Sequence, residues 1–150
     1  MDNDKLKDAV LKAVNLTFMD MALVDTMYHE SCETDVVEFS HILHIGFKAP
    51  ADGSMILFLP TACKRMIVEN VYGSDWAELS ADEIDDCLLE LLSVLAGNFL
   101  TMYCGKETMY NMSFPEILFD ESEVSGRAEQ TEFCFDAEDV LFKVAIALKD

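Results

Sequence analysis

Between residues 80 and 103, acidic side chains recur at a spacing that suits a chemical role. Asp82, Asp86 and Glu90 stand four residues apart, so on a helix they form one stripe in which each carboxylate repels the next. Ser93 and Gly97 continue the same face. A carboxylate beside a small hydroxyl can bind a cationic group and orient a water molecule. The pattern alone also fits a solvated helix face without a partner, and this alternative stays open.

Gly97 is unusual because a glycine inside a helix costs about 1 kcal/mol relative to alanine. Such a glycine is tolerated most readily where another backbone must approach closely. Small side chains surround it, from Ser93 and Ala96 to Thr101. The face therefore predicts a flat docking surface for another protein, with Asp86, Gly97 and Thr101 as its partner-binding residues.

Other chemistry has less support from the sequence. Ser93 as a covalent nucleophile would need a base, and His29, His41 and His44 are distant along the chain. His41 and His44 are three residues apart on an expected strand, so they face opposite sides and do not converge on a metal. The five cysteines include no pair at the usual spacing of a zinc site. We expect no metal site.

Size and composition predict one compact unit. The chain has 150 residues, of which 51% are hydrophobic and 26% are charged, enough for a packed core and suited to a single domain over residues 1–150. The charged start at Met1–Asp8 does not resemble a signal peptide. No uninterrupted apolar run reaches the roughly 18 residues that span a membrane. We therefore expect a cytoplasmic protein without membrane insertion.

The charge excludes two classes of partner, nucleic acids and anionic membranes. Acidic residues number 29 and basic residues 10, which gives a formal net charge of −19. Such a chain repels nucleic acid phosphates and anionic membranes.

The odd number of cysteines, without a C-x-x-C pair, predicts reduced thiols that fill the core of a cytosolic protein.

Three helices are expected to support the candidate face. Asp4–Leu23 is amphipathic, with apolar residues at spacings of three and four. Pro60–Tyr72 begins at a proline and stops before Gly73. Ser80–Tyr103 is the clearest, because Ser80 with Glu83 forms a capping box and Gly105 ends the helix.

Five strands are expected, in two groups. Val36–Ala49 alternates apolar and polar residues and forms a hairpin with Ser54–Leu59. Thr108–Phe114, Gly126–Phe135 and Val140–Leu148 follow the last helix, with a turn at Asp136–Asp139. The last segment also fits a helix, but its β-branched and aromatic residues favour a strand. The predicted class is α+β, an antiparallel sheet of mixed strand order with long helices on it.

The segment ELLSVLAGN, from Glu90 to Asn98, resembles the E-x-x-N-x-x-x-G segment of the CheX, CheC and FliY chemotaxis phosphatases. The order of elements from about Val36 onward is also similar to CheX, and a single copy of the motif matches CheX rather than CheC. Glu90 matches the family's glutamate. Ser93 occupies the position of the asparagine, and this is a departure from the family's pattern.

The resemblance implies an activity and a partner. Members of this family remove phosphate from an aspartate of the response regulator CheY, whose receiver domain supplies the magnesium ion, so the chain itself needs no cofactor. Glu90 would pair with the regulator's lysine, and Ser93 would place the attacking water, as an aspartyl-phosphate phosphatase requires. The resemblance also implies a homodimer formed through strands of the sheet.

Two functional hypotheses follow from the missing asparagine. In the first, the protein hydrolyses the aspartyl phosphate of a CheY-type regulator, with activity weakened by Ser93. In the alternative, it is a catalytically inactive module for receiver binding or dimerisation in chemotaxis or two-component signalling. A serine is two heavy atoms shorter than an asparagine, so water placement is the step in question. The cognate regulator and the reason for the strong negative charge are not contained in the sequence.

Overall fold

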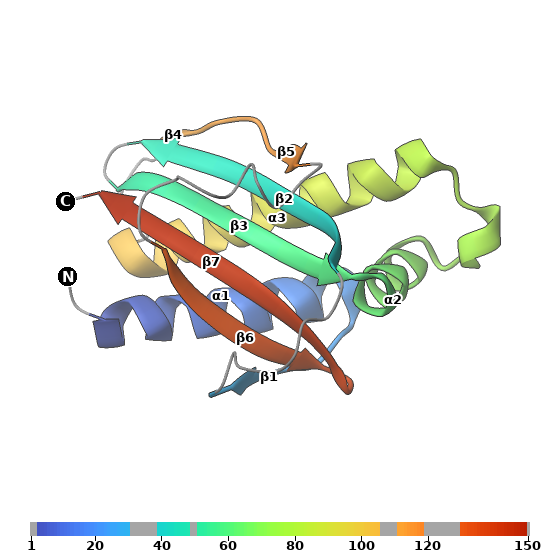
Figure 1. Cartoon of the computed structure of the whole chain (residues 1–150), viewed down its shortest axis with the longest axis horizontal. Helices are drawn as coiled ribbons and strands as arrows, with labels where there is room; N and C mark the ends of the chain where they lie inside the picture. Colours follow the sequence, from blue (N-terminus) through green and yellow to red (C-terminus); the bar gives the residue numbers. More distant parts are fainter. Residues whose placement is uncertain (1–2, 31–38, 49–50, 106–110, 119–129, 150) are drawn as a thin grey trace.

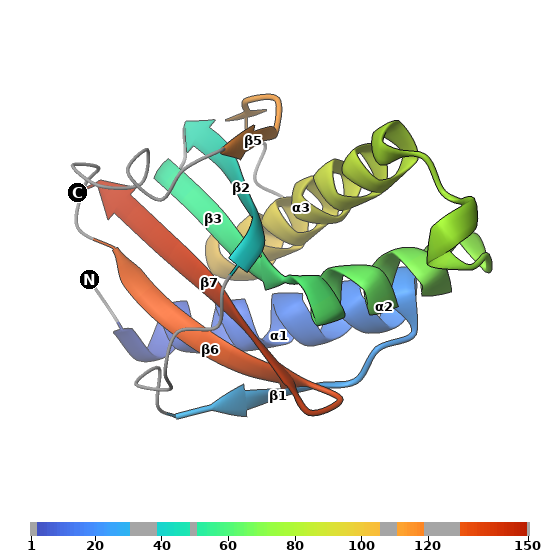
Figure 2. The ribbon, with the colours of Figure 1, turned by 45° about the vertical axis from the view of Figure 1, so that its right-hand side comes forward.

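One antiparallel sheet and three α-helices make up the computed structural model, which describes residues 3–30, 39–48, 51–105, 111–118 and 130–149 (Figure 1). The long helices α1 and α3 lie side by side against one face of the sheet, and α2 lies at one end of it (Figures 1 and 2). The elements in chain order are α1 (Asn3–Ala22), β1 (Thr26–His29), β2 (Phe39–Lys48), β3 (Asp52–Pro60), α2 (Thr61–Tyr72), the 3-10 turn η1 (Trp76–Glu78), α3 (Ala81–Cys104), β4 (Asn111–Met112), β5 (Glu116–Leu118), β6 (Thr131–Ala137) and β7 (Val140–Lys149).

All strand pairs in the sheet are antiparallel, and their order differs from the order in the chain. The strands follow β1-β6-β7-β3-β2-β4, and β5 also pairs with β2. The hairpins β2–β3 and β6–β7 were both expected from alternation and turn residues, and both form. They join through β3 and β7, where Ser54 pairs with Ala147 and Leu57 with Val144. The predicted α+β class with helices on an antiparallel sheet is confirmed.

The helix ends follow local sequence signals. The Glu83 N–H donates to Ser80 Oγ at 3.1 Å, and the Ser80 N–H donates to Glu83 Oε1 at 3.0 Å, so the predicted capping box starts α3. Gly73 ends α2 in the left-handed conformation, with φ 65°, and its N–H donates to the Glu69 carbonyl. Glycine adopts this conformation without a steric cost.

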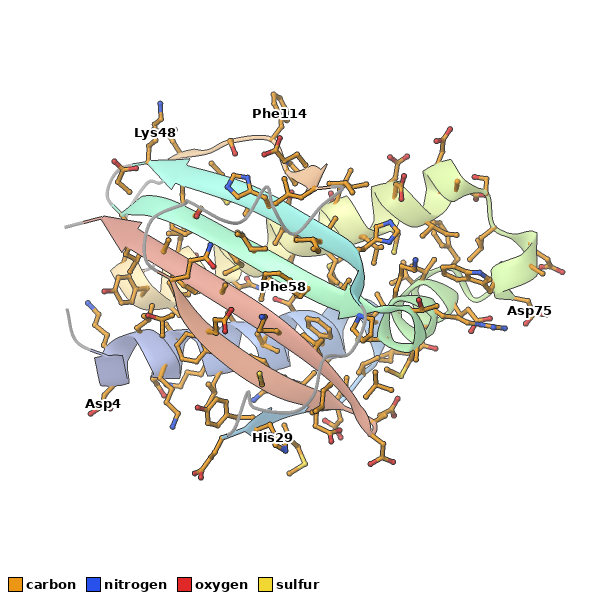
Figure 3. The ribbon with its side chains drawn as sticks, in the orientation of Figure 1. Asp4, His29, Lys48, Phe58, Asp75 and Phe114 are labelled. Carbon is orange, nitrogen blue, oxygen red and sulfur yellow. The ribbon has the colours of Figure 1, made fainter. Side chains whose placement is uncertain are left out.

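The core lies between the sheet and the two long helices. On β2, Leu43, Ile45 and Phe47 are buried against the helices, which matches the predicted alternation. Phe142 of β7 stacks on Phe18 of α1 with ring centroids 4.7 Å apart. On the other face of the sheet a smaller buried cluster gathers around Phe58 (Figure 3); its members are Ile42, Ile56, Phe58, Leu118 and Ala145.

Two short strands were not predicted from the sequence. Thr26–His29 was not among the predicted strands, yet it pairs with β6 as strand β1. Glu116–Leu118 was not among them either, and it pairs with β2 as strand β5. The ends of several expected strands, at residues 36–38, 49, 108–110 and 126–129, lie outside the described residues.

The turn expected at Asp136–Asp139 is shorter than predicted. β6 continues to Ala137, so only Glu138 and Asp139 connect it to β7. Both have positive φ, 50° and 75°. The Asp139 N–H donates to Asp136 Oδ1 at 2.7 Å. The Asp136 carboxylate therefore has a structural role in the turn.

The cysteines differ from the expectation at one position. Cys63, Cys87 and Cys104 are free thiols, and the first two are buried, as predicted for core-filling thiols. Cys134 is disulfide-bonded, so the expectation that all the cysteines are reduced is wrong for Cys134. Cys32 lies outside the described residues.

One helix of the described residues, α3, is long and apolar enough to cross a membrane by length and composition, with a mean hydropathy of 1.6 over its most apolar window. Half of that window is buried inside the protein. Leu88, Leu91 and Leu95 have no exposed surface and belong to the core against α1 and the sheet. Burial in the core accounts for the apolar character of α3.

Candidate functional site

The outward face of α3 carries the acidic stripe that the sequence indicated. Asp82, Asp86 and Glu90 are exposed, and Ser93 is half-buried. Glu90 and Ser93 are separated by three residues on one continuous helix, so their side chains leave the same face one turn apart. This geometry presents a carboxylate and a hydroxyl together to an incoming surface, and their functional roles remain predictions.

Gly97 does not lie on the accessible surface. It was predicted to lie on the exposed face as a partner-binding residue, but it is buried, as is its neighbour Ala96. The next residue, Asn98, donates its side-chain amide to Thr17 Oγ1 of α1 at 2.8 Å. We interpret the small residues as part of the contact between α3 and α1, which form the most extensive helix pair in the described structure. Gly97 therefore does not contribute to an accessible docking surface.

The remaining predicted contact residues divide by exposure. Asp86 is exposed and one turn from Glu90, whereas Thr101 is half-buried near the end of α3. Near that end, Lys5 of α1 lies over the Tyr103 ring, 4.8 Å from its centroid. The exposed part of the face therefore consists of Asp82, Asp86 and Glu90, and Ser93 lies half-buried one turn beyond Glu90.

A polar chain that the sequence reasoning missed joins α3 to α2 and β2. His41 Nε2 of β2 lies 2.9 Å from Asp85 Oδ1 of α3. Lys64 Nζ of α2 lies 3.0 Å from His41 Nδ1. Lys64 is 8% exposed, and burial lowers the pKa of its ammonium while the Asp85 carboxylate acts against this change. No local spacing signals this chain, because its members come from three different elements.

The two histidines of β2 contact different groups. His41 contacts Asp85 and Lys64, whereas His44 Nδ1 lies 3.0 Å from Glu116 Oε1 of the neighbouring strand β5. Within the described ranges of the chain, no three His, Cys, Asp or Glu side chains come together as metal ligands would.

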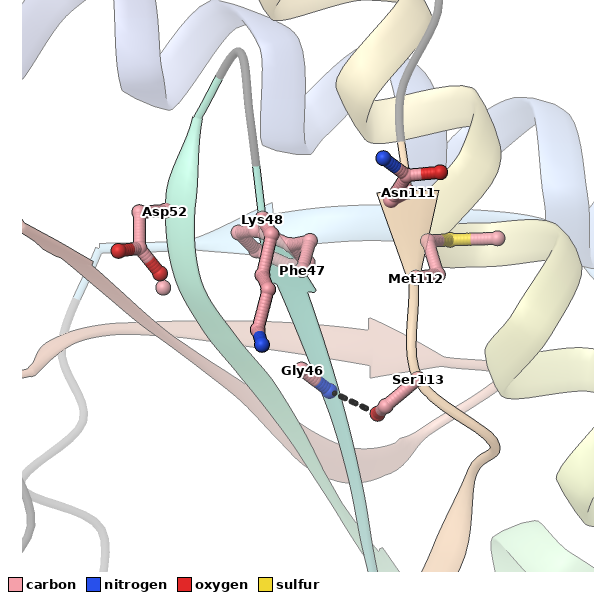
Figure 4. A pocket seen from close by; sticks show the side chains of 8 residues that line it. Gly46, Phe47, Lys48, Asp52, Asn111, Met112 and Ser113 are labelled. Atoms are coloured by element: carbon pink, nitrogen blue, oxygen red, sulfur yellow. Dashed lines mark hydrogen bonds between the residues drawn. The ribbon is translucent and has the colours of Figure 1, made fainter.

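A pocket of about 360 Å³ lies where β2, β3 and β4 meet (Figure 4). Ser113 forms part of its wall: the Gly46 N–H donates to Ser113 Oγ at 2.9 Å, and the Ser113 N–H donates to the Gly46 carbonyl at 2.8 Å. The residues that line the pocket are Gly46, Phe47, Lys48, Asp52, Gly53, Asn111, Met112 and Ser113. We assign this pocket no ligand.

Phe114 projects from the link between β4 and β5 and is 95% exposed (Figure 3). The link includes Pro115, and its two strands flank β2 at the edge of the sheet.

Solved structures share this arrangement of helices and sheet over nearly the whole chain. A CheX from Borrelia burgdorferi, crystallised in a complex with CheY, BeF3 and Mg²⁺, has a TM-score of 0.74 at 17% identity, covering 95% of this chain and 97% of that chain. CheX from Desulfovibrio desulfuricans gives 0.74 at 11% identity, with 96% and 99% covered. A CheC-like protein from Shewanella sp. PV-4 gives 0.72 at 13% identity, with 97% and 98% covered.

The fold is therefore that of the CheX- and CheC-like chemotaxis proteins, as the sequence predicted. A search of curated protein sequences finds no match. The family model for the chemotaxis phosphatase CheX matches residues 42–138. The chain belongs to the CheX family, and the predicted family assignment is confirmed.

Proposed function

We propose that this protein binds the receiver domain of a phosphorylated CheY-type response regulator through the exposed face of α3 and hydrolyses its aspartyl phosphate. One observation carries the proposal. In a chain of the CheX family, Glu90 is exposed and Ser93 follows one turn later on the same face. The CheX from Borrelia burgdorferi was crystallised with CheY, which supports a receiver domain as the partner.

In the proposed reaction, the chain supplies orientation only. Glu90 pairs with a lysine of the receiver and holds the two proteins in register. The Ser93 hydroxyl can donate to a water molecule and accept from it, placing the water in line with the phosphorus–oxygen bond. The water oxygen attacks phosphorus, the bond to the receiver aspartate breaks, and the aspartate carboxylate and inorganic phosphate leave. The receiver supplies the magnesium ion, so catalysis by this chain is catalysis by positioning.

Ser93 favours a second candidate function, that of a receiver-binding module without turnover. The family's motif has asparagine where this chain has serine. Because the serine side chain is shorter, its hydroxyl lies closer to the helix surface than the amide of an asparagine would. Ser93 is also half-buried. Binding through Glu90 and Asp86 does not need that hydroxyl.

A dephosphorylation assay with a phosphorylated CheY-type regulator tests the docking role of Glu90. Removal of its charge in Glu90→Gln should weaken binding to the regulator with BeF3 and slow any loss of phosphate. Glu78→Gln is the matched control, because it removes the same charge from an exposed side chain on η1. Equal effects of the two substitutions would show that net charge, rather than the α3 face, governs the interaction.

Ser93→Asn separates the two candidate functions. If Ser93 limits water placement, the asparagine should raise the rate of phosphate release by about 100-fold, because a misplacement of about 1 Å costs a factor of that size. Binding without turnover in the native chain, and turnover in Ser93→Asn, would identify a binding module. Unchanged slow turnover in Ser93→Asn would show that the missing asparagine is not the limiting feature.

We also propose a cytoplasmic homodimer. The edge of the sheet at β4 and β5, with the exposed Phe114, supports association through strands. Light scattering should then give a mass near twice 16.9 kDa, and Phe114→Ser should reduce it. A monomer mass at all concentrations would refute the dimer.

The disulfide at Cys134 is unusual for a reducing compartment, and counting free thiols in fresh lysate checks the cytoplasmic location.

A further inference from the structure

The polar chain from Lys64 through His41 to Asp85 joins three elements at the first turns of α3. Its two contacts measure 3.0 Å and 2.9 Å. Lys64 also lies over the ring of Trp76, with Nζ 5.5 Å from the ring centroid. A lysine, a histidine and a carboxylate in sequence are a specific arrangement, because each contact requires a defined donor and acceptor.

The contacts fix the proton positions on the imidazole. A lysine ammonium only donates, so His41 Nδ1 accepts from Lys64. The other ring nitrogen, Nε2, then carries the hydrogen and donates to the Asp85 carboxylate. The imidazole thus bridges the lysine and the carboxylate, and each of its two ring nitrogens has a partner. The side chains of His41 and Asp85 are 16% and 39% exposed, so the chain leads from a buried ammonium to the protein surface.

Stability alone does not account for this chain. Burial lowers the pKa of Lys64 despite the attraction of Asp85, so the folded environment disfavours the charged ammonium on balance. Buried ionic groups of this kind often contribute little net stability compared with apolar side chains of similar size. A role in specifying one arrangement of the helices is a better explanation.

The position of the chain along α3 indicates what it specifies. Asp85 precedes Glu90 by five residues, about 7.5 Å along the helix axis. Asn98 follows Ser93 by five residues and donates to Thr17 of α1. Glu90 and Ser93 therefore lie between two polar contacts of α3, one made by Asp85 and one made by Asn98. The buried side of α3 between them is rich in leucine, namely Leu88, Leu91, Leu92 and Leu95, and such a surface fixes rotation less precisely than hydrogen bonds do.

We propose that Lys64, His41 and Asp85 are positioning residues that set the rotation and depth of α3, so that Glu90 and Ser93 meet the receiver in register. This inference rests on the proposed function and deepens it. In this proposal the three side chains of the polar chain do not contact the receiver. They act by fixing the position of α3. Displacements of about 1 Å at a site that works by positioning reduce its efficiency by about two orders of magnitude.

Three variants test the proposal against the regulator with BeF3. His41→Leu removes both hydrogen bonds and should weaken receiver binding and slow any loss of phosphate, the latter by up to about 100-fold for a misplacement of about 1 Å. His41→Gln keeps an acceptor for Lys64 and a donor for Asp85, so it should restore binding to within about 3-fold of the native value. Val144→Ala is the stability control, since Val144 is a fully buried residue of β7 and its truncation weakens the fold without touching the polar chain.

The unfolding free energy of each variant is measured by urea denaturation, and its loss of receiver binding is compared with its loss of stability. If Val144→Ala weakens binding as much as His41→Leu does, or if His41→Gln fails to restore binding, the positioning role is refuted. Lys64→Met provides a second perturbation, because it removes the ammonium while preserving the contact between His41 and Asp85. Lys64→Met should give a smaller loss of affinity than His41→Leu. An equal loss would contradict the proposed roles of the three residues.

A readout independent of receiver binding keeps this inference separate from the proposed function. Amide hydrogen exchange should accelerate more over Ala81–Glu90 than elsewhere in His41→Leu, whereas any acceleration in Val144→Ala should be spread over the core. Trp76 is the single tryptophan of the chain, so its emission reports the loss of Lys64 in Lys64→Met. If no receiver binds the native protein, the proposed function fails. Unchanged exchange in His41→Leu would then refute the positioning role separately.

Discussion

Gly53 provides the sharpest prediction about the sheet that supports α3. A Cβ placed on Gly53 would lie 1.9 Å from the carbonyl oxygen of Ala147 and 2.9 Å from its carbonyl carbon, both in the backbone of β7. Real Cβ contacts essentially never fall below 3.0 Å, so Gly53→Ala must move one strand by at least about 1.1 Å. The clash is with backbone and no side chain can turn away. We expect a loss of unfolding free energy of about 3 kcal/mol, the upper part of the range for overpacking.

Two other glycines serve as controls in the same assay. A Cβ on Gly46 would lie 3.4 Å from Ser113 Oγ, so Gly46→Ala should change the unfolding free energy by less than about 1 kcal/mol. A Cβ on Gly73 would meet nothing within 4 Å, but its φ is +65°, and Gly73→Ala should cost about 1–2 kcal/mol through backbone strain.

Urea denaturation followed by circular dichroism measures all three variants. The slope with denaturant should remain constant while the midpoint of Gly53→Ala falls furthest. The reasoning would be refuted if Gly53→Ala were as stable as Gly46→Ala. The start of β3 would then accept a side chain for which the spacing to β7 leaves no room.

Further predictions concern the core and the helix contact. Phe142→Ala removes the ring that stacks on Phe18 and should cost about 3–5 kcal/mol of unfolding free energy, measured by urea denaturation. Asn98→Leu and Thr17→Val each leave a polar partner unsatisfied and should each cost about 1–3 kcal/mol, while the double variant should cost less than their sum. Burial raises the pKa of the Cys63 thiol from 9.0 to about 12, so the folded state binds more protons than the unfolded state in this range. Stability should therefore fall as pH rises from about 9 toward 12, and Cys63→Ala should reduce this fall in denaturation series at several pH values.

The elements with local signals could be predicted from the sequence. The capping box at Ser80 and Glu83 and the glycine stop at Gly73 are encoded within a few residues. The alternation on β2 and β7 likewise follows from the side chains themselves, since one face of each strand must be buried.

The two missed strands depend on their partners rather than on their own composition. Thr26–His29 has no alternation of its own, and it becomes a strand because β6 offers hydrogen-bonding groups in register. Glu116–Leu118 is too short for a periodic signal and is defined by its pairing with β2. Such strands are products of tertiary structure.

The candidate site divides in the same way. Exposure of Glu90 followed from the width of the apolar stripe on α3, whereas the burial of Gly97 depends on how the folded chain packs around α3. The chain of Lys64, His41 and Asp85 spans 44 residues between its histidine and its carboxylate. No spacing rule connects residues so far apart, so only the folded arrangement reveals the contact.

The β6–β7 turn suggests a practical use for engineering. Glu138 and Asp139 both adopt positive φ without being glycine, a conformation that costs about 1–2 kcal/mol for each ordinary residue. An Asn-Gly pair is favoured in such two-residue turns. Installing that pair would raise the melting temperature without altering α3. A thermostable background of this kind would keep weakened helix variants folded, so that their effects on recognition could be measured free of unfolding.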